Sequence, residues 1–141
     1  MTVSNLHHVA IRVQDPDRSR RFYEDVLGLS FMELPVGEAI TGIWRGSPKE
    51  GTLLATQAGE TFVTLAPPLE GTPADDRFSE RRIGVDHLAF GVDDRATLDE
   101  LVERLRADGV KTAGVEIDPV LNKEYVCFRD PDNVQWEFYT R

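Results

Sequence analysis

The sequence predicts an α+β fold built from two copies of one strand-helix-strand-strand-strand unit. An internal repeat, a helix-like pattern after the first strand of each copy, and strand-like segments that close each copy support this prediction. The chain has 141 residues, which suits a single domain with a sizeable core. We expect one domain over residues 1–141, with a first module at about 5–66, a linker at about 67–84 and a second module at about 85–141.

The internal repeat is clearest in two strand-like segments, Leu6–Val13 and Val85–Val92. Each alternates large apolar residues with small or polar residues, as a strand with one buried face does. The apolar residues share one face, and a histidine lies on the other face, His8 in the first copy and His87 in the second. We therefore expect two equivalent concave sheets that face a shared space.

A helix is predicted after each of these two strands. The first begins at Asp15-Pro16, because aspartate caps free amides and proline suits the first helical position, and it ends at Gly28. The second begins near Asp93-Asp94 and ends at Gly109. Apolar residues of the second helix recur at helical spacing: Leu98, Leu101, Val102 and Leu105. The apolar faces of helices and strands can therefore bury each other.

Further strand-like segments close each module. They are Thr52–Gln57 and Thr61–Ala66 in the first module, and Lys111–Ile117, Glu124–Arg129 and Val134–Thr140 in the second. Turn residues predict tight turns at residues 58–60 and 130–133. A longer, less regular stretch, Val36–Gly51, precedes the hairpin of the first module, so the two modules match in order with an insertion in the first.

Composition and charge count against several classes of partner. The net charge of -9 argues against a nucleic-acid-binding surface, which needs clustered basic residues. No stretch approaches the roughly 20 apolar residues of a membrane span, and the N-terminus has no secretory pattern. The one cysteine, Cys127, fits a reducing compartment. We expect a cytoplasmic protein whose partner is a small-molecule substrate, and neither nucleic acid nor a membrane.

Three residues indicate a metal site: His8, His87 and Glu137. The histidines occupy equivalent positions of the repeated strand, and Glu137 alternates with Trp136 and Phe138 in the last strand. A carboxylate on that inner face is costly to bury unless it is paired or ligated. Two imidazoles and one carboxylate suit a divalent metal ion and leave coordination positions open. We expect one such ion, with Fe(II) or Mn(II) favoured and Zn(II) or Ni(II) as alternatives.

The segments that carry these residues resemble the vicinal oxygen chelate superfamily. They are His8–Ile11, Phe22–Gly28, His87–Phe90 and Asp130–Glu137, and in this order they cover nearly the whole chain. The superfamily includes glyoxalase I, extradiol dioxygenases, methylmalonyl-CoA epimerase, fosfomycin resistance enzymes and bleomycin-binding proteins. The resemblance implies two βαβββ modules related by a pseudo-twofold axis, which form a curved, cup-like mixed sheet around the metal, often in a homodimer.

The chain departs from two patterns within that superfamily. Thr64 lies at the position of the first module that corresponds to Glu137, where glyoxalase I carries a metal-binding carboxylate. The remaining set resembles the two-histidine, one-glutamate triad of extradiol dioxygenases and fosfomycin resistance enzymes. Both usually have a tyrosine ten residues before the glutamate, and here that residue is Cys127. Tyr125 lies on the same predicted face and is our candidate for the catalytic proton donor, with a place in the pocket wall as the alternative.

Other side chains on these faces are candidates for contact with substrate. Arg12 shares the face of His8 and suits a bidentate contact with a carboxylate or phosphate, unless it lies in solvent at the strand's end. Gln135 and Tyr139 flank Glu137 and are expected to orient it. The substrate-binding set that we predict is Arg12, Thr64, Cys127 and Arg129.

The leading functional hypothesis is a metal-dependent enzyme whose small substrate chelates the ion through adjacent oxygens, with a preference for dioxygenase-type chemistry. A glyoxalase-like lyase or isomerase and a thiol transferase are alternatives within the same class. A second hypothesis is a non-catalytic drug-binding protein like those of bleomycin resistance. A third is a metal that only stabilises the fold.

Overall fold

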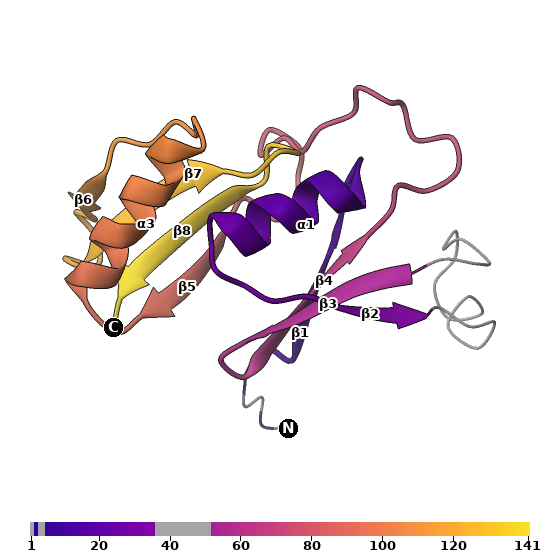
Figure 1. Ribbon diagram of the computed structural model, residues 1–141. Helices are drawn as coiled ribbons and strands as arrows, with labels where there is room; N and C mark the ends of the chain where they lie inside the picture. Colours follow the sequence, from indigo (N-terminus) through magenta and orange to yellow (C-terminus); the bar gives the residue numbers. More distant parts are fainter. Residues whose placement is uncertain (1, 3–4, 36–51) are drawn as a thin grey trace. The chain divides into compact units, whose positions relative to one another are not determined.

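The computed structural model describes residues 2, 5–35 and 52–141, so the predicted irregular stretch Val36–Gly51 lies outside the described residues. The predicted α+β class is confirmed, with two four-stranded mixed sheets and two described helices (Figure 1). By its internal contacts the chain divides into unit 1, Met1–Glu24 with Gly28–Asp76, and unit 2, Asp25–Leu27 with Arg77–Arg141. No helix among the described residues is long and apolar enough to cross a membrane.

The sheet of unit 1 has the strand order β1-β4-β3-β2. Its strands are β1 (His8–Arg12), β2 (Met32–Pro35), β3 (Thr52–Ala58) and β4 (Thr61–Ala66). β1 and β4 are parallel, and the other neighbours are antiparallel. Its buried side chains follow the predicted alternation: Ile11, Val13, Val63 and Leu65. β2 was not predicted from the sequence, and all four of its side chains are exposed, so it has no buried face.

The sheet of unit 2 repeats this arrangement with the order β5-β8-β7-β6. Its strands are β5 (Leu88–Val92), β6 (Val115–Ile117), β7 (Glu124–Arg129) and β8 (Gln135–Thr140). β5 and β8 are parallel, as β1 and β4 are in unit 1. Val126, Phe128 and Trp136 are buried on one face, so Cys127 and Glu137 lie on the other face of the same sheet.

The two ladders give the repeat a definite register. Ala10 of β1 pairs with Thr64 of β4, and Ala89 of β5 pairs with Glu137 of β8. Each histidine precedes its alanine by two residues, so His8 corresponds to His87. Thr64 therefore lies at the position of unit 1 that Glu137 occupies in unit 2.

Both predicted helices begin with an aspartate cap. α1 (Pro16–Asp25) follows Asp15, whose Oδ1 accepts a hydrogen bond from the Arg18 amide at 3.0 Å. α3 (Arg95–Ala107) follows Asp94, whose Oδ1 accepts from the Thr97 amide at 2.9 Å. α3 lies against β6, β7 and β8 through the predicted stripe, which is buried: Leu98, Leu101, Val102 and Leu105.

One predicted strand is much shorter than expected. Of the segment Lys111–Ile117, only Val115–Ile117 forms β6. Gly114 has a φ of 91°, a backbone conformation that cannot continue a strand. Its amide instead donates to Oγ1 of Thr112 at 3.1 Å. Alternation alone could not reveal this interruption.

Candidate metal centre

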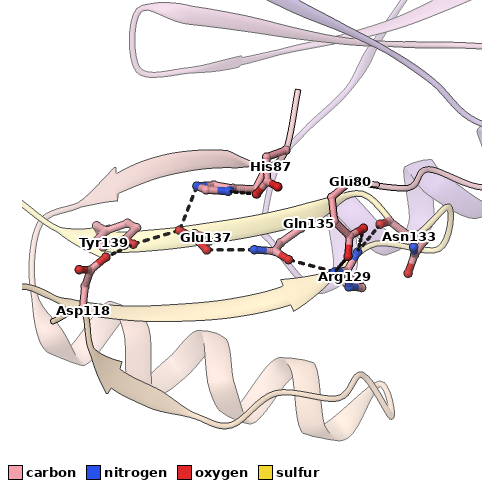
Figure 2. Close-up of polar contacts among 9 residues, drawn as sticks. Glu80, His87, Asp118, Arg129, Asn133, Gln135, Glu137 and Tyr139 are labelled. Atoms are coloured by element: carbon pink, nitrogen blue, oxygen red, sulfur yellow. Dashed lines mark hydrogen bonds and ion pairs between the residues drawn. The ribbon is translucent and has the colours of Figure 1, made fainter. Parts of the chain in front are cut away.

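A cluster of polar side chains joined by hydrogen bonds lies on the face of the unit 2 sheet that carries Glu137. That side chain is only 10% exposed and belongs to the central strand β8. His87 immediately precedes β5, which pairs directly with β8. Nε2 of His87 lies 3.4 Å from Oε2 of Glu137 (Figure 2). Parallel pairing of β5 and β8 thus brings together two residues that are 50 positions apart in the chain.

The other ring nitrogen of His87 is held by the residue before it. Nδ1 lies 2.7 Å from Oδ1 of Asp86. An ionised carboxylate only accepts hydrogen bonds, so this contact needs a proton on Nδ1. A neutral imidazole then has an unprotonated Nε2, the form that binds metal ions. Asp86 therefore favours the ligand tautomer of His87.

The distance between His87 and Glu137 fits two ligands of one ion. Nitrogen and oxygen ligands bind divalent ions such as zinc at about 2.1 Å, which separates neighbouring ligands by about 3.0–3.4 Å in octahedral or tetrahedral geometry. The observed 3.4 Å falls in this range and is long for a direct hydrogen bond. The spacing of these two donor atoms is thus compatible with two ligands of one divalent ion.

Both oxygens of Glu137 are also contacted from within β8. Nε2 of Gln135 donates to Oε1 at 3.1 Å, and the hydroxyl of Tyr139 lies 3.0 Å from Oε2. The same hydroxyl lies 2.7 Å from Oδ2 of Asp118, which follows β6. Burial, followed by the hydrogen bonds to Asp118 and Glu137, raises the pKa of Tyr139 far above its usual value. The phenol therefore stays protonated between two carboxylates, and its predicted role in orienting Glu137 stays a prediction.

Gln135 connects Glu137 to a second group of charged side chains. Its Oε1 accepts from Nη2 of Arg129 at 3.0 Å. The guanidinium of Arg129 also donates to Glu80 at 3.0 and 3.3 Å and to the Asn133 carbonyl at 3.0 Å. Figure 2 shows the resulting chain of contacts from Glu80 to Glu137 along β7 and β8.

The remaining predicted ligand, His8, belongs to unit 1. Its Nδ1 lies 3.0 Å from Nδ1 of His7, so each of the two histidines is contacted at Nδ1 by the residue before it. His7 is also near Phe62, with ring centroids 6.0 Å apart. Among the described residues, no three His, Cys, Asp or Glu side chains form a metal-holding group. His87 and Glu137 are thus two ligand candidates within one unit, and His8 is the third in the other unit.

The predicted substrate-contacting residues have local partners. In unit 1, Nη1 of Arg12 donates to the Pro67 carbonyl at 2.9 Å, and Oγ1 of Thr64 lies 3.4 Å from the Val9 carbonyl. In unit 2, Arg129 makes the contacts described above. Only the positions of these side chains follow from the structure, and their contacts with substrate stay predictions.

Tyr125 and Cys127 lie on the Glu137 face, as their alternation predicted. Cys127 pairs with Glu137 across β7 and β8, and Tyr125 stacks on Tyr139 with ring centroids 5.1 Å apart. Burial is the main cause that raises the pKa of both side chains, and the Glu137 carboxylate adds to each rise. The thiol and the phenol are therefore neutral at pH 7. A neutral thiol is a poor nucleophile, whereas a neutral phenol keeps a proton to donate.

Three contributors to this cluster were not singled out from the sequence. The position of Asp86 next to the candidate ligand His87 could have indicated it from the sequence. Asp118 and Glu80 gave no signal, because each reaches the cluster from a segment outside the sheet's regular strands.

Comparison with known proteins places this chain in a family. The family model described as the glyoxalase/bleomycin resistance protein/dioxygenase superfamily matches residues 5–138. The Bacillus subtilis protein YwkD is 31% identical over 140 residues, which cover 99% of this chain and 98% of YwkD. A crystal structure of a glyoxylase/bleomycin resistance protein/dioxygenase domain from Frankia sp. EAN1pec is 29% identical with a TM-score of 0.76, and the match covers 99% of this chain and 98% of that one.

A more distant structure shares the fold at 18% identity. It is a mutant of the fosfomycin resistance protein FosX from Listeria monocytogenes, complexed with Mn(II) and 1S,2S-dihydroxypropylphosphonic acid. The TM-score is 0.66, and the match covers 98% of this chain and 90% of that one. Since the family model spans nearly the whole sequence and both sheets have the family's arrangement, the chain belongs to the glyoxalase/bleomycin resistance protein/dioxygenase superfamily.

Proposed function

We propose that this protein is a metalloenzyme that holds one divalent ion through His8, His87 and Glu137 and acts on a small substrate with adjacent oxygens. The observation that carries the proposal is the 3.4 Å approach of His87 Nε2 to Glu137 Oε2. The other polar atom of each side chain is already engaged, His87 Nδ1 by Asp86 and Glu137 Oε1 by Gln135. Such outer contacts are typical of metal ligands.

His8 completes the ligand set by its equivalence to His87 in the repeat. Its Nδ1 is likewise contacted by the preceding residue, here His7, at 3.0 Å. The equivalent of Glu137 in unit 1 is Thr64, which is a poor ligand for a divalent ion. Three protein ligands leave open positions, as in catalytic rather than structural zinc sites. The proposal therefore favours catalysis over a purely structural metal, and it makes non-catalytic drug binding the weaker alternative.

When bound, the ion would supply Lewis-acid charge to the adjacent oxygens of the substrate. Tyr125 is our candidate proton donor, because its phenol stays protonated and lies on the face of Glu137. Arg12, Thr64, Cys127 and Arg129 stay our candidates for contact with the substrate.

We favour oxygen-dependent cleavage of a catechol-like substrate as the first reaction to test, since the ligand set has two histidines and one glutamate. A lyase, isomerase or thiol transferase is the second candidate, because the retained proton of Tyr125 also suits proton transfer to a substrate carbon or oxygen. Oxygen consumption separates the two candidates, since only the first consumes dioxygen with a catechol.

The metal content of the purified protein tests the proposed centre. Wild type, Glu137→Gln and the control Glu116→Gln, which changes an exposed carboxylate of β6, are reconstituted separately with Fe(II), Mn(II) and Zn(II). We expect about one ion per chain in wild type and control, and less than about a tenth of that in Glu137→Gln. Absence of bound ion from all three proteins would overturn the metalloenzyme and leave the drug-binding alternative.

A further inference from the structure

We propose that Arg129 and Asp118 are positioning residues that set the direction of the hydrogen bonds at the two oxygens of Glu137. Neither residue contacts Glu137 itself. Arg129 acts through the amide of Gln135, and Asp118 acts through the hydroxyl of Tyr139 (Figure 2). The inference rests on the proposed function, because it concerns how this carboxylate is prepared to bind a divalent ion.

Arg129 determines which end of the Gln135 amide faces Glu137. A guanidinium has only donors, so the atom of Gln135 that lies 3.0 Å from Nη2 must be the carbonyl oxygen. The amide NH2 then points to Glu137, where it donates to Oε1 at 3.1 Å. Glu80 and the Asn133 carbonyl hold the guanidinium in place. Without Arg129, the carbonyl end of the Gln135 amide loses its donor, so only the contact with Glu137 would hold the amide and its orientation would be less well fixed.

Asp118 determines where the single proton of Tyr139 points. Oδ1 of Asp118 already accepts from the amides of Val120 and Leu121 at 2.7 and 2.8 Å. Oδ2 is therefore the acceptor for the Tyr139 hydroxyl, at 2.7 Å, a shorter contact than the 3.0 Å to Glu137 Oε2. A hydroxyl donates one proton at a time. The proton is thus drawn to Asp118 and away from Glu137.

The contacts with Gln135 and Tyr139 place the two oxygens of Glu137 in different environments. Oε1 is anchored by the Gln135 donor, which holds the carboxylate in one orientation. Oε2, the atom that lies 3.4 Å from Nε2 of His87, has only the longer of the two contacts of the Tyr139 hydroxyl, so its lone pairs stay more available to an ion. That is the oxygen which must bind the ion with His87.

The affinity for Mn(II), measured from the EPR signal of the free ion, tests the Arg129 contact. Loss of a positive charge close to the site would by itself strengthen the binding of a dication. We expect the opposite from Arg129→Gln, an affinity about tenfold weaker, because Gln135 is no longer oriented. The matched control Arg95→Gln removes an arginine that bridges Asp99 and Glu124 in the same unit, and it should leave the affinity unchanged. In a Gln135→Leu background, Arg129→Gln should have no further weakening effect.

The Asp118 contact is tested with the nearly isosteric change Asp118→Asn. Its carbonyl oxygen can keep the backbone contacts, so the NH2 group replaces Oδ2 and donates to Tyr139. The Tyr139 proton must then turn to Glu137 Oε2, and we expect Mn(II) binding about tenfold weaker. In a Tyr139→Phe background this proton is absent, so Asp118→Asn should change the affinity by less than about twofold. An equal loss in both backgrounds would show a charge effect and overturn the role of Asp118.

A measurement without metal separates this inference from the proposed function. In metal-free protein, the side-chain amide signals of Gln135, assigned by their loss in Gln135→Leu, should be displaced from those of exposed glutamines. They should return to the exposed range in Arg129→Gln but not in Arg95→Gln. If wild type binds no ion, the proposed function fails and these signals alone decide the inference. Undisplaced signals in wild type, or Mn(II) affinity unchanged or increased in Arg129→Gln, would overturn it.

Discussion

Oδ1 of Asp86 lies 2.7 Å from Nδ1 of His87, the residue that follows it in the chain. This contact explains how a neutral imidazole presents an unprotonated Nε2 to the position beside Glu137. The aspartate is therefore part of the proposed metal centre, although it is not one of the proposed ligands.

Replacement of Asp86 should weaken metal binding without unfolding the protein. We expect Asp86→Ala to lower Mn(II) affinity about tenfold, because the imidazole loses the acceptor that selects its tautomer and orientation. Asp86 and His87 are both exposed, so the thermal midpoint of unfolding should change little. Asp93→Ala, which changes an exposed aspartate just after β5, is the control and should bind Mn(II) like wild type. Equal affinities for Asp86→Ala and wild type would exclude this role.

Removal of the metal should leave the protein folded. The core of unit 2 is complete without the ion, with Trp136 and Leu98 fully buried. We expect the chelated protein to keep its circular dichroism spectrum and to unfold cooperatively. Its free energy of unfolding should fall only by the lost binding energy of the ion, about 2.7 kcal/mol at an ion concentration 100 times Kd. Loss of the spectrum on chelation would instead favour a structural metal.

The helix α3 is predicted to depend on its buried stripe. Leu98 is fully buried where α3 lies against the sheet of unit 2, so Leu98→Ala should lower the free energy of unfolding by about 2–5 kcal/mol. Ile117, which is 66% exposed at the end of β6, is the control. Ile117→Ala should change the free energy by less than about 0.5 kcal/mol. Similar losses in the two variants, measured by urea denaturation, would contradict the packing described for α3.

The cap of α3 predicts a dependence of stability on pH. The amide of Thr97 is the main cause that lowers the pKa of Asp94 below 3.8, and the Thr97 hydroxyl adds to it. A carboxyl whose pKa is lower in the folded state stabilises the protein above its unfolded pKa, and this contribution is lost as the pH falls through the folded value.

Asp94→Asn keeps a capping oxygen that does not titrate, so it separates the cap from its charge. We expect the thermal midpoint of wild type to fall more steeply than that of Asp94→Asn below pH 3.8. At pH 7, Asp94→Ala should have a midpoint about 3 °C below that of Asp94→Asn. Parallel pH profiles for wild type and Asp94→Asn would show that the charge of this cap is not important.

Features that follow from a local residue pattern could be predicted from the sequence alone. The predicted strand segments cover β1, β4, β5, β7 and β8 in full and β3 except for its last residue, and the period of apolar residues with a capping aspartate located α3. The repeat gave the equivalence of His8 with His87 and of Thr64 with Glu137, which the strand registers confirm. These features were accessible because each one follows from the spacing of residues within a short segment.

Which side chains meet around Glu137 depends on the tertiary structure and could not be read from local residue spacing. The contact of Tyr139 with Asp118 joins residues 21 positions apart, and that of Arg129 with Glu80 joins residues 49 positions apart. Asp118 follows the short strand β6, and Glu80 lies in the segment of the chain that connects β4 to β5. Neither segment has the alternation of a strand or the period of a helix. Such contacts depend on the register of β7 against β8 and on the paths of two irregular segments. Since a hydrogen bond needs its two atoms within about 3 Å, residue spacing alone could not specify them.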